Sequence, residues 1–352
     1  MASSIGPYTV DVVIPCYNEE GVIPRTVVEV LDLVRSYLAR PDLGLSSFRI
    51  LLVDDGSKDG TWAQIAALAG DNPEVVGIKL TKNYGHQAAL LAGLSHVEAD
   101  ACISIDADLQ DDPHVMEDML KGFEGGNDLV LGIRSSREPD SRFKRGTAVV
   151  FYKLMSFFGT TAIPNHADFR LMSNRALEAL LAHKEVNLFL RGLISTIGFR
   201  TLLVPYKRKP RHAGETKYSL HKMVALAIDG VTSFSVTPLR IISVLGAMVF
   251  AFSGVIALYV LIIRIFTTQA TVGWASTLLP ILMLGGLQIL SIGVLGEYIG
   301  KTYLEVKRRP LFFVERTIDR TIVRGFGEAV SHPVRSRRLR PVADSADRKP
   351  TG

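Results

Sequence analysis

The sequence predicts an α/β domain with a doubly wound sheet, followed by two transmembrane helices. Up to about residue 135, short apolar runs rich in β-branched residues alternate with segments of helical periodicity, as in α/β proteins. Acidic residues directly follow several of these runs, where α/β domains place their ligands. Beyond residue 238, two long segments carry no charge, which is typical of membrane-spanning helices.

Composition narrows the classes of function. The chain has 352 residues, of which 47% are hydrophobic, and a formal net charge of +5. Its basic residues gather near 134–145, 207–222 and 301–309 and in the tail, and the last three groups flank apolar segments or the chain end. We therefore expect contact with a membrane surface and no nucleic acid, whose binding also calls for stacking aromatics among the basic residues.

The two cysteines, Cys16 and Cys102, lie in apolar runs and are predicted to be small core residues. Neither a disulfide framework nor a zinc site is expected from them. The first residues show no basic region followed by a long apolar core, so the α/β domain is expected in the cytosol.

Five near-continuous apolar runs predict strands that are covered on both faces of a sheet. They occupy residues 10–15, 48–55, 75–80, 101–108 and 128–134. Because helical segments separate them, the strands should run parallel, with their carboxyl ends along one edge.

Three helices are predicted between these strands. The first follows Pro24 and repeats apolar residues at helical spacing, namely Val27, Leu31, Val34 and Leu38. The second presents Trp62, Ile65, Ala66 and Leu68 in a similar way. The third is predicted to start with Asp112 as N-cap and Pro113 as first residue, and to turn Val115, Met119 and Phe123 inward.

Residues 241–263 and 277–295 are uncharged over about 23 and about 19 residues, each enough to cross a hydrocarbon core of ~30 Å. A pair of buried core helices is the alternative. Basic residues precede the first segment and follow the second, whereas the loop between them offers only Arg264. The positive-inside rule then places both ends in the cytosol, as in a multi-pass protein of the inner (plasma) membrane.

These patterns predict the domain boundaries. Residues 1–217 form the cytosolic α/β domain, 218–238 interfacial amphipathic helices, 239–300 the transmembrane hairpin, 301–327 a cytosolic C-terminal segment, and 328–352 a disordered basic tail.

Acidic clusters follow three of the predicted strands. Asn18, Glu19 and Glu20 follow the first, Asp54 and Asp55 the second, and Asp106 and Asp108 the fourth. Since these ends share one edge of the sheet, the clusters should converge on one crevice. For Asp54 and Asp55, capping of the following helix is the alternative.

The spacing Asp106-x-Asp108 lets both carboxylates address one site, because alternate residues of an extended segment point the same way. Oxygen ligands without nearby His or Cys favour Mg²⁺ or Mn²⁺. No G-x-G-x-x-G follows the first strand and no G-x-x-x-x-G-K-[ST] occurs, so the phosphate cradles of dinucleotide and P-loop enzymes are missing.

Several strings carry a resemblance to a known family. VVIPCYNEE, LLVDDGSKDGT, LTKNYGHQAALLAG and ISIDADLQDDP resemble, in order and spacing, the nucleotide-sugar half of family 2 glycosyltransferases with the GT-A fold. VLGIRSSR, NHADFRLMSNRAL and RHAGETKYS, followed by an apolar pair, resemble the polyprenyl-phosphate glycosyltransferases, the group of dolichyl-phosphate mannose synthase and the bactoprenol glucosyltransferases. The similarity covers about residues 8 to 310.

The resemblance implies roles at the donor end. The base and ribose pocket would be lined by Pro15, Tyr17, Asn18 and Glu19, with Asp54 on the base and Asp55 nearby. The cation that bridges the donor diphosphate would be held by Asp106, Asp108 and Gln110.

It also implies roles at the acceptor end. The acceptor phosphate would meet Arg134, Arg145 and Arg170, while the catalytic group would comprise Asp168, Arg211 and Lys217. Alternatives are a solvated basic face for Arg145 and a structural pair of Asp168 with Arg170. His86 and His166 are predicted to be helix-start or packing residues.

The implied function is inverting transfer of one sugar from a nucleoside diphosphate sugar, with UDP-glucose favoured, to a polyprenyl phosphate at the cytosolic membrane face. A homo-oligomer is expected. The alternatives are a non-phosphorylated glycolipid or cell-wall acceptor, or an inactive membrane scaffold for sugar export. The polymer-synthase signature Q-x-x-R-W is missing, since neither Trp62 nor Trp274 follows an arginine.

Overall fold

The computed structural model describes residues 6–134, 166–183, 190–207, 237–266 and 274–320. The chain divides into two units, Met1–Arg320 and Thr321–Gly352, and the second lies outside the described residues. All of the helices and strands described below belong to the first unit.

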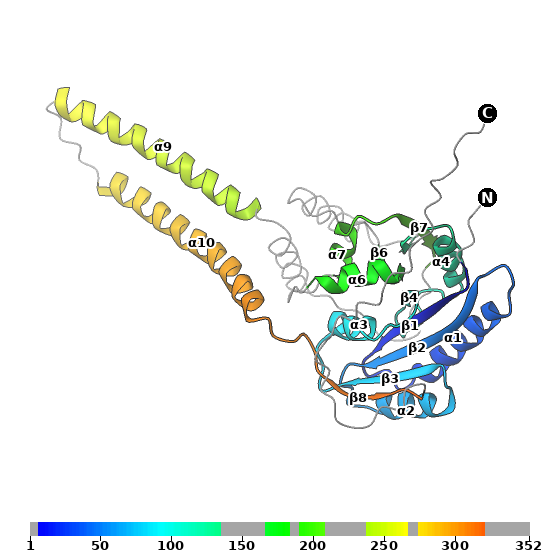
Figure 1. Ribbon diagram of the computed structural model, residues 1–352. Coiled ribbons are helices and arrows are strands. Elements are labelled where there is room, and N and C mark those ends of the chain that lie inside the picture. Colours follow the sequence, from blue (N-terminus) through cyan, green and yellow to red (C-terminus); the bar gives the residue numbers. More distant parts are fainter. Residues whose placement is uncertain (1–5, 135–165, 184–189, 208–236, 267–273, 321–352) are drawn as a thin grey trace, which may run out of the picture. The chain divides into compact units, whose positions relative to one another are not determined.

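An eight-stranded mixed sheet forms the centre of the α/β domain (Figure 1). Its strand order is β7-β5-β6-β4-β1-β2-β3-β8. The strands are β1 (Tyr8–Cys16), β2 (Leu45–Asp54), β3 (Val75–Leu80), β4 (Ala101–Ser104), β5 (Leu129–Arg134), β6 (His166–Ser173), β7 (Thr201–Tyr206) and β8 (Val314–Ile318). β1 pairs in parallel with β2 and β4, β2 with β3, and β5 with β7, whereas β6 and β8 are antiparallel to their neighbours.

The helices of this domain are α1 (Ile23–Leu38), α2 (Thr61–Asp71), α3 (His86–Leu94), α4 (Val115–Glu124), α6 (Asn174–Ala182) and α7 (Leu190–Thr196). They cover the sheet on both sides, as the continuous apolar strands predict. The predicted doubly wound α/β domain is confirmed, and its sheet is mixed, because β6 and β8 run antiparallel to their neighbours.

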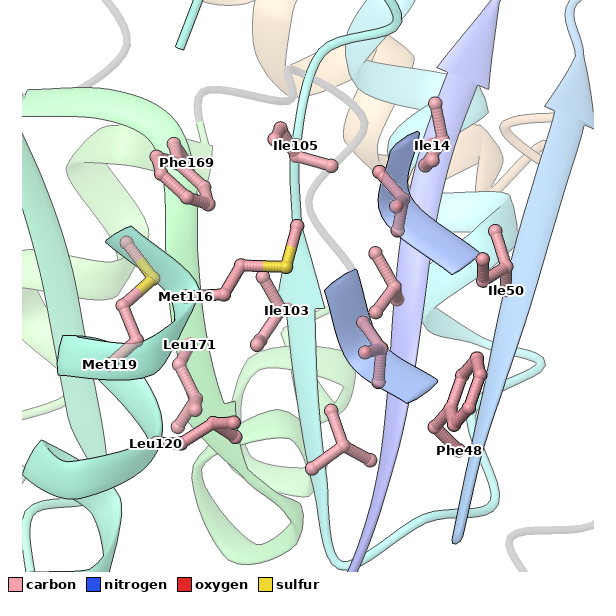
Figure 2. Packing of buried hydrophobic residues seen from close by; sticks show 14 of the residues in the cluster. Ile14, Phe48, Ile50, Ile103, Ile105, Met116, Met119, Leu120, Phe169 and Leu171 are labelled. Carbon is pink, nitrogen blue, oxygen red and sulfur yellow. The ribbon is translucent and has the colours of Figure 1, made fainter. Parts of the chain in front are cut away.

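Successive strand residues serve two cores. On one side, Ile14, Ile50 and Ile103 pack with α1, α2 and α4, and Figure 2 shows Met116 and Leu120 of α4 among them. On the other side, β1 and β2 pack against α3, and β4 and β6 pack against α6, while β6 also meets α7. Cys16 and Cys102 are buried free thiols, as predicted.

The start of α4 differs from the prediction. Asp112 is not the N-cap, because the helix begins at Val115 with His114 before it. The chain first makes a turn, in which Val115 N donates to the carbonyl of Asp112, while the Asp112 carboxylate accepts from His114 N at 3.3 Å. The predicted inward face holds, since Met119 and Phe123 are buried.

An unpredicted strand, β8, returns the chain to the sheet after the last helix. It pairs with β3, and Thr81 N donates to the carbonyl of Phe313 at 3.0 Å. Lys79 forms an ion pair with Glu315 at 2.9 Å. Part of residues 301–327, which were predicted as a C-terminal segment outside the α/β domain, thus belongs to its sheet.

The long helices α9 (Thr237–Phe266) and α10 (Trp274–Lys307) contain the two uncharged segments and contact each other. Several of their large apolar side chains are exposed, among them Phe252, Ile289 and Ile292. Over the residues that were described, no helix has the length and apolar character that crossing a membrane requires. The predicted spans are therefore not shown.

Candidate active site

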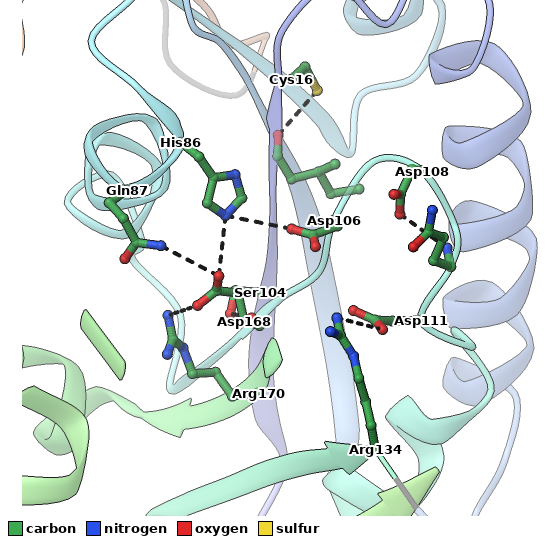
Figure 3. A network of polar contacts seen from close by, with 12 residues as sticks. Cys16, His86, Gln87, Ser104, Asp106, Asp108, Asp111, Arg134, Asp168 and Arg170 are labelled. Atoms are coloured by element: carbon green, nitrogen blue, oxygen red, sulfur yellow. Dashed lines mark hydrogen bonds and ion pairs between the residues drawn. The ribbon is translucent and has the colours of Figure 1, made fainter. Parts of the chain in front are cut away.

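Polar side chains from distant parts of the sequence meet at one edge of the sheet. The carboxyl ends of β1, β2, β4, β5 and β7 lie there, and so does the amino end of antiparallel β6. Figure 3 shows Asp106, Asp111, Arg134 and Asp168 gathered at this edge, with Arg170 next to Asp168. The acidic clusters after β1, β2 and β4 thus lie at one edge, as predicted, and Arg134 at the end of β5 lies at the same edge.

The loop after β4 carries the predicted metal ligands. Leu109 has a φ of 50°, a left-handed conformation that turns the chain sharply after Asp108. The Asp108 carboxylate accepts from the backbone N–H of Gln110 at 3.1 Å, which closes the turn. Asp106 stands at the start of this loop with 30% of its side chain exposed.

Negative charge is crowded around Asp106. Burial raises the pKa of its carboxyl; His86 opposes this shift, and the nearby carboxylates of Asp168, Asp111 and Asp108 add to it. A divalent cation would relieve this repulsion, so Asp106, Asp108 and Gln110 fit the predicted ion. In the described part of the chain, no group of three or more His, Cys, Asp or Glu side chains is arranged for a metal, and the ligand set stays a prediction.

Asp168, on β6, is buried and held through both carboxylate oxygens. Oδ1 accepts from Arg170 Nη2 at 3.3 Å, and Oδ2 accepts from Gln87 Nε2 at 3.4 Å. The backbone carbonyl of Asp168 accepts a hydrogen bond from Ser104 Oγ at 2.5 Å. These contacts are those of a fixed anion that orients its surroundings, as in the predicted alternative of a pair with Arg170.

Arg170 lies behind Asp168, since its side chain is 0% exposed. This buried guanidinium supports Asp168 through its contact with Oδ1. The predicted contact of Arg170 with the acceptor phosphate stays a prediction.

His86 is the first residue of α3, as predicted, but it also enters the site. Its Nε2 lies 3.4 Å from Asp168 Oδ2 and 3.6 Å from Asp106 Oδ1. The imidazole thus joins the loop after β4 to β6 (Figure 3). Its place directly after Gly85, at the start of the helix that follows β3, is the sequence signal that indicates proximity to the acidic strand ends.

Arg134 is the last residue of β5, and 26% of its side chain is exposed at this edge. Its Nη2 is 3.4 Å from Asp111 Oδ1, and its Nε donates to the Tyr206 hydroxyl at 3.3 Å. Tyr206 OH in turn donates to Asp111 Oδ1 at 2.6 Å. Burial and the Asp111 charge raise the pKa of Tyr206, which keeps the phenol protonated.

Tyr206 was not predicted as a site residue. The only sequence signal for it is a polar aromatic residue at the end of an apolar run, directly before a basic stretch. That signal is weak without knowledge that β7 lies beside β5.

Asp54 is completely buried at the end of β2. Its Oδ1 accepts from Ser57 N at 3.0 Å, and among the described residues Oδ2 has no hydrogen-bond partner. It does not cap α2, whose N-cap is Gly60 without a side-chain bond. A buried acceptor without a partner is costly unless a ligand satisfies it.

Asp55 holds a loop instead of capping the next helix. Its two oxygens accept from the backbone N–H groups of Tyr84 and Gly85 at 2.7 and 2.9 Å. Burial raises its pKa, and these two bonds oppose the shift. Asp55 thereby fixes the residues before His86.

The loop after β1 is tied to the loop after β2. Asn18, at a φ of 54°, accepts through Oδ1 from Lys58 N at 2.9 Å, and Glu19 N donates to Thr61 Oγ1 at 2.8 Å. Pro15 is buried in β1, and Tyr17 is 41% exposed. These contacts give the predicted pocket walls a rigid support.

Three predicted residues, Arg145, Arg211 and Lys217, lie outside the described residues, as does the side chain of His166. The predicted interfacial helices and basic tail also fall there.

Comparisons with known proteins match residues 11–181 to the model of Glycosyl transferase family 2. The uncharacterized glycosyltransferase YkoT of Bacillus subtilis (strain 168) is 47% identical over 306 residues, which are 86% of this chain and 90% of that protein. The prophage bactoprenol glucosyl transferase homolog of Escherichia coli (strain K12) is 42% identical over 311 residues, 87% of this chain and 98% of that protein.

Among solved structures, the mannosyltransferase PcManGT from Pyrobaculum calidifontis in complex with GDP-Man and Mn²⁺ is similar with a TM-score of 0.41 and 14% identity, over 86% of this chain and 87% of that chain. The sequence relatives define the class: the chain belongs to glycosyltransferase family 2. Within the family it is close to the bactoprenol glucosyl transferases.

Proposed function

We propose that this protein transfers a single sugar from a nucleoside diphosphate sugar, with UDP-glucose favoured, to a polyprenyl phosphate at the cytosolic face of a membrane. The observation that carries the proposal is the meeting of the acidic loop of Asp106 and Asp108 with Arg134 at one sheet edge. One end suits a donor diphosphate with its cation, and the other suits an anionic acceptor. The similarity to a bactoprenol glucosyl transferase homolog supports the same pair of substrates.

The buried Oδ2 of Asp54 supports a nucleotide at the donor end, because a ring N–H of the base would satisfy this acceptor. Asp106, Asp108 and Gln110 would hold Mg²⁺ or Mn²⁺. The ion, when bound, would neutralise charge on the leaving diphosphate.

The acceptor chemistry needs orientation more than proton removal. A phosphate monoester with a second pKa near 6 is largely ionised at neutral pH and attacks without a strong base. Asp168, with both oxygens engaged, would orient groups around the sugar. Arg134 would bind the acceptor phosphate, with Arg145, Arg211 and Lys217 as further cations, and direct displacement would invert the anomeric centre.

The lipid tail gives a role to the apolar pair α9 and α10. We infer that their uncharged segments form the membrane hairpin that holds the enzyme where its acceptor lies. β7 before the pair and β8 after it belong to one sheet, so both ends of a crossing pair would lie on one side of the bilayer. Basic residues flank both outer ends of the pair. Because Lys and Arg are enriched in loops on the cytosolic side of membranes, these ends are expected in the cytosol.

A transfer assay tests the proposal. Full-length protein in detergent would receive a short polyprenyl phosphate, Mn²⁺ or Mg²⁺, and one radiolabelled UDP- or GDP-sugar at a time, with EDTA controls. We expect a chloroform-soluble sugar phospholipid from one donor, formed only with the cation. Donor hydrolysis without lipid product would contradict the acceptor, and no turnover of any donor would favour the inactive scaffold.

A further inference from the structure

Tyr206 occupies a fixed place beside Arg134. The two residues are direct partners in the parallel pairing of β5 with β7, so both side chains emerge at the same sheet edge. The Tyr206 hydroxyl stands between Arg134 Nε, from which it accepts at 3.3 Å, and Asp111 Oδ1, to which it donates at 2.6 Å. Three separate segments therefore end in one hydrogen-bonded unit.

Packing leaves the Tyr206 ring little freedom. It is 4% exposed and meets Phe169 edge to face, with ring centroids 5.7 Å apart. On β5, a Cβ at Gly132 would come within 2.9 Å of Tyr206 Cε1, so the absence of a side chain there makes room for the ring. The packing of the core thus fixes the position of the hydroxyl.

Arg134 gains from this fixed partner. An arginine side chain has many rotamers, and ordering it for a ligand costs conformational entropy. The contacts with Tyr206 and Asp111 order it in advance while 26% of the side chain stays exposed. Asp111 also directly follows Gln110, so the same unit connects Arg134 to the metal loop.

We propose that Tyr206 is a positioning residue for the acceptor, which holds the Arg134 guanidinium in the orientation that binds the phosphate of the lipid. The inference rests on the proposed function, because that function assigns an acceptor phosphate to Arg134. Tyr206 itself need not touch either substrate.

The variant Tyr206→Phe tests this role, since it keeps the ring and its packing and removes only the hydroxyl. The KM for the polyprenyl phosphate should rise roughly 3- to 10-fold, the loss expected for one hydrogen bond. The KM for the sugar donor and kcat at saturating acceptor should stay within about 2-fold.

Tyr8→Phe is a matched control. Tyr8 is also buried, packs edge to face on Phe123 at 5.2 Å, and donates its hydroxyl to a carboxylate, that of Glu124, at 3.0 Å. It stands at the start of β1, away from the carboxyl edge, so its loss should leave both KM values unchanged.

A double-mutant cycle separates positioning from a structural effect. If Tyr206 acts through Arg134, adding Tyr206→Phe to Arg134→Ala should change the acceptor KM no further. The inference would be overturned if Tyr206→Phe raised both KM values equally or left the acceptor KM unchanged. It would also be overturned if Tyr206→Phe raised the acceptor KM as much in the Arg134→Ala protein as in the wild type. A wild-type enzyme that makes no lipid-linked sugar would instead refute the proposed function and the inference with it.

Discussion

Asp168 and Arg170 form an ion pair that is almost closed to solvent, with side chains 5% and 0% exposed. A buried charge that loses its partner is strongly destabilising, whereas the complete pair is not in itself a large source of stability. The contribution of Asp168 to stability can therefore be measured separately from activity.

We predict that Asp168→Asn lowers the free energy of unfolding by about 3 kcal/mol, because it leaves the Arg170 charge buried without its carboxylate. The double variant Asp168→Asn with Arg170→Gln should recover part of this loss. Denaturant unfolding of the three proteins measures both quantities. A single variant as stable as the wild type would show that the pair does not hold Asp168.

The pKa of Asp106 is raised by burial and by the carboxylates around it. Folding disfavours its ionised form, so Asp106→Asn should raise the Tm of the cation-free protein at neutral pH. As the pH falls through the raised pKa, the wild-type carboxyl becomes neutral too and the difference should vanish.

Adding Mn²⁺ to the wild type should raise its Tm, since the ion would relieve the same repulsion, and Asp108→Asn should abolish this rise. Thermal scans in EDTA and in Mn²⁺ make the comparison. A Mn²⁺ effect that survives Asp108→Asn would place the ion elsewhere.

At the scale of elements, the close approach of α3 to the sheet sets the position of His86. A Cβ at Gly93 would lie 2.3 Å from Val13 Cγ1 and 2.9 Å from Val53 Cγ2. Only glycine lets the helix lie this close to β1 and β2. The N-terminal end of the same helix then brings its first residue between two carboxylates.

Gly93→Ala should therefore destabilise the protein by roughly 1–3 kcal/mol through overpacking. Gly70→Ala is the control: this glycine of α2 has open space around it, and alanine there should stabilise by about 0.5 kcal/mol. Unfolding free energies of the two variants should thus change in opposite directions. Equal tolerance at both positions would argue against the tight contact of α3.

Elements differ in how well the sequence predicts them. β1 to β5 are buried on both faces and give continuous apolar runs. β6 alternates Phe169 and Leu171 with the buried pair Asp168 and Arg170, so it lacks such a run. β8 has the sequence VERTI and lies at the edge of the sheet. Its three central residues are polar and exposed, so it lacks the apolar run that predicts a strand.

The residues of the candidate site also differ in how well the sequence predicts their positions. Residues at predicted strand ends, such as Asp54 and Asp106, could be placed at one edge from the sequence. The contacts of His86 with Asp168 and of Tyr206 with Arg134 could not, because they depend on the order β7-β5-β6-β4, in which neighbouring strands are not consecutive.

At the scale of the whole molecule, the return of the chain to its sheet through β8 makes the proposed membrane topology testable. Cys16 and Cys102 are 2% and 0% exposed, so the natural thiols should react slowly. A cysteine introduced at Thr268, between α9 and α10, should react with a membrane-impermeant maleimide in intact cells. One introduced at Arg316, on β8 and 60% exposed, should react only after lysis. The reverse pattern would contradict the topology.

The proposed function requires that one edge of the sheet joins a donor site to a site for an anionic lipid acceptor at Arg134. To test this, both KM values should be measured for Arg134→Ala and for Arg175→Ala. Arg175 also pairs with an aspartate, Asp128, but lies outside this edge. Arg134→Ala should raise the acceptor KM roughly 10- to 100-fold with little change in the donor KM, while Arg175→Ala changes neither. An unchanged acceptor KM in Arg134→Ala, or equal changes in both KM values, would contradict the account.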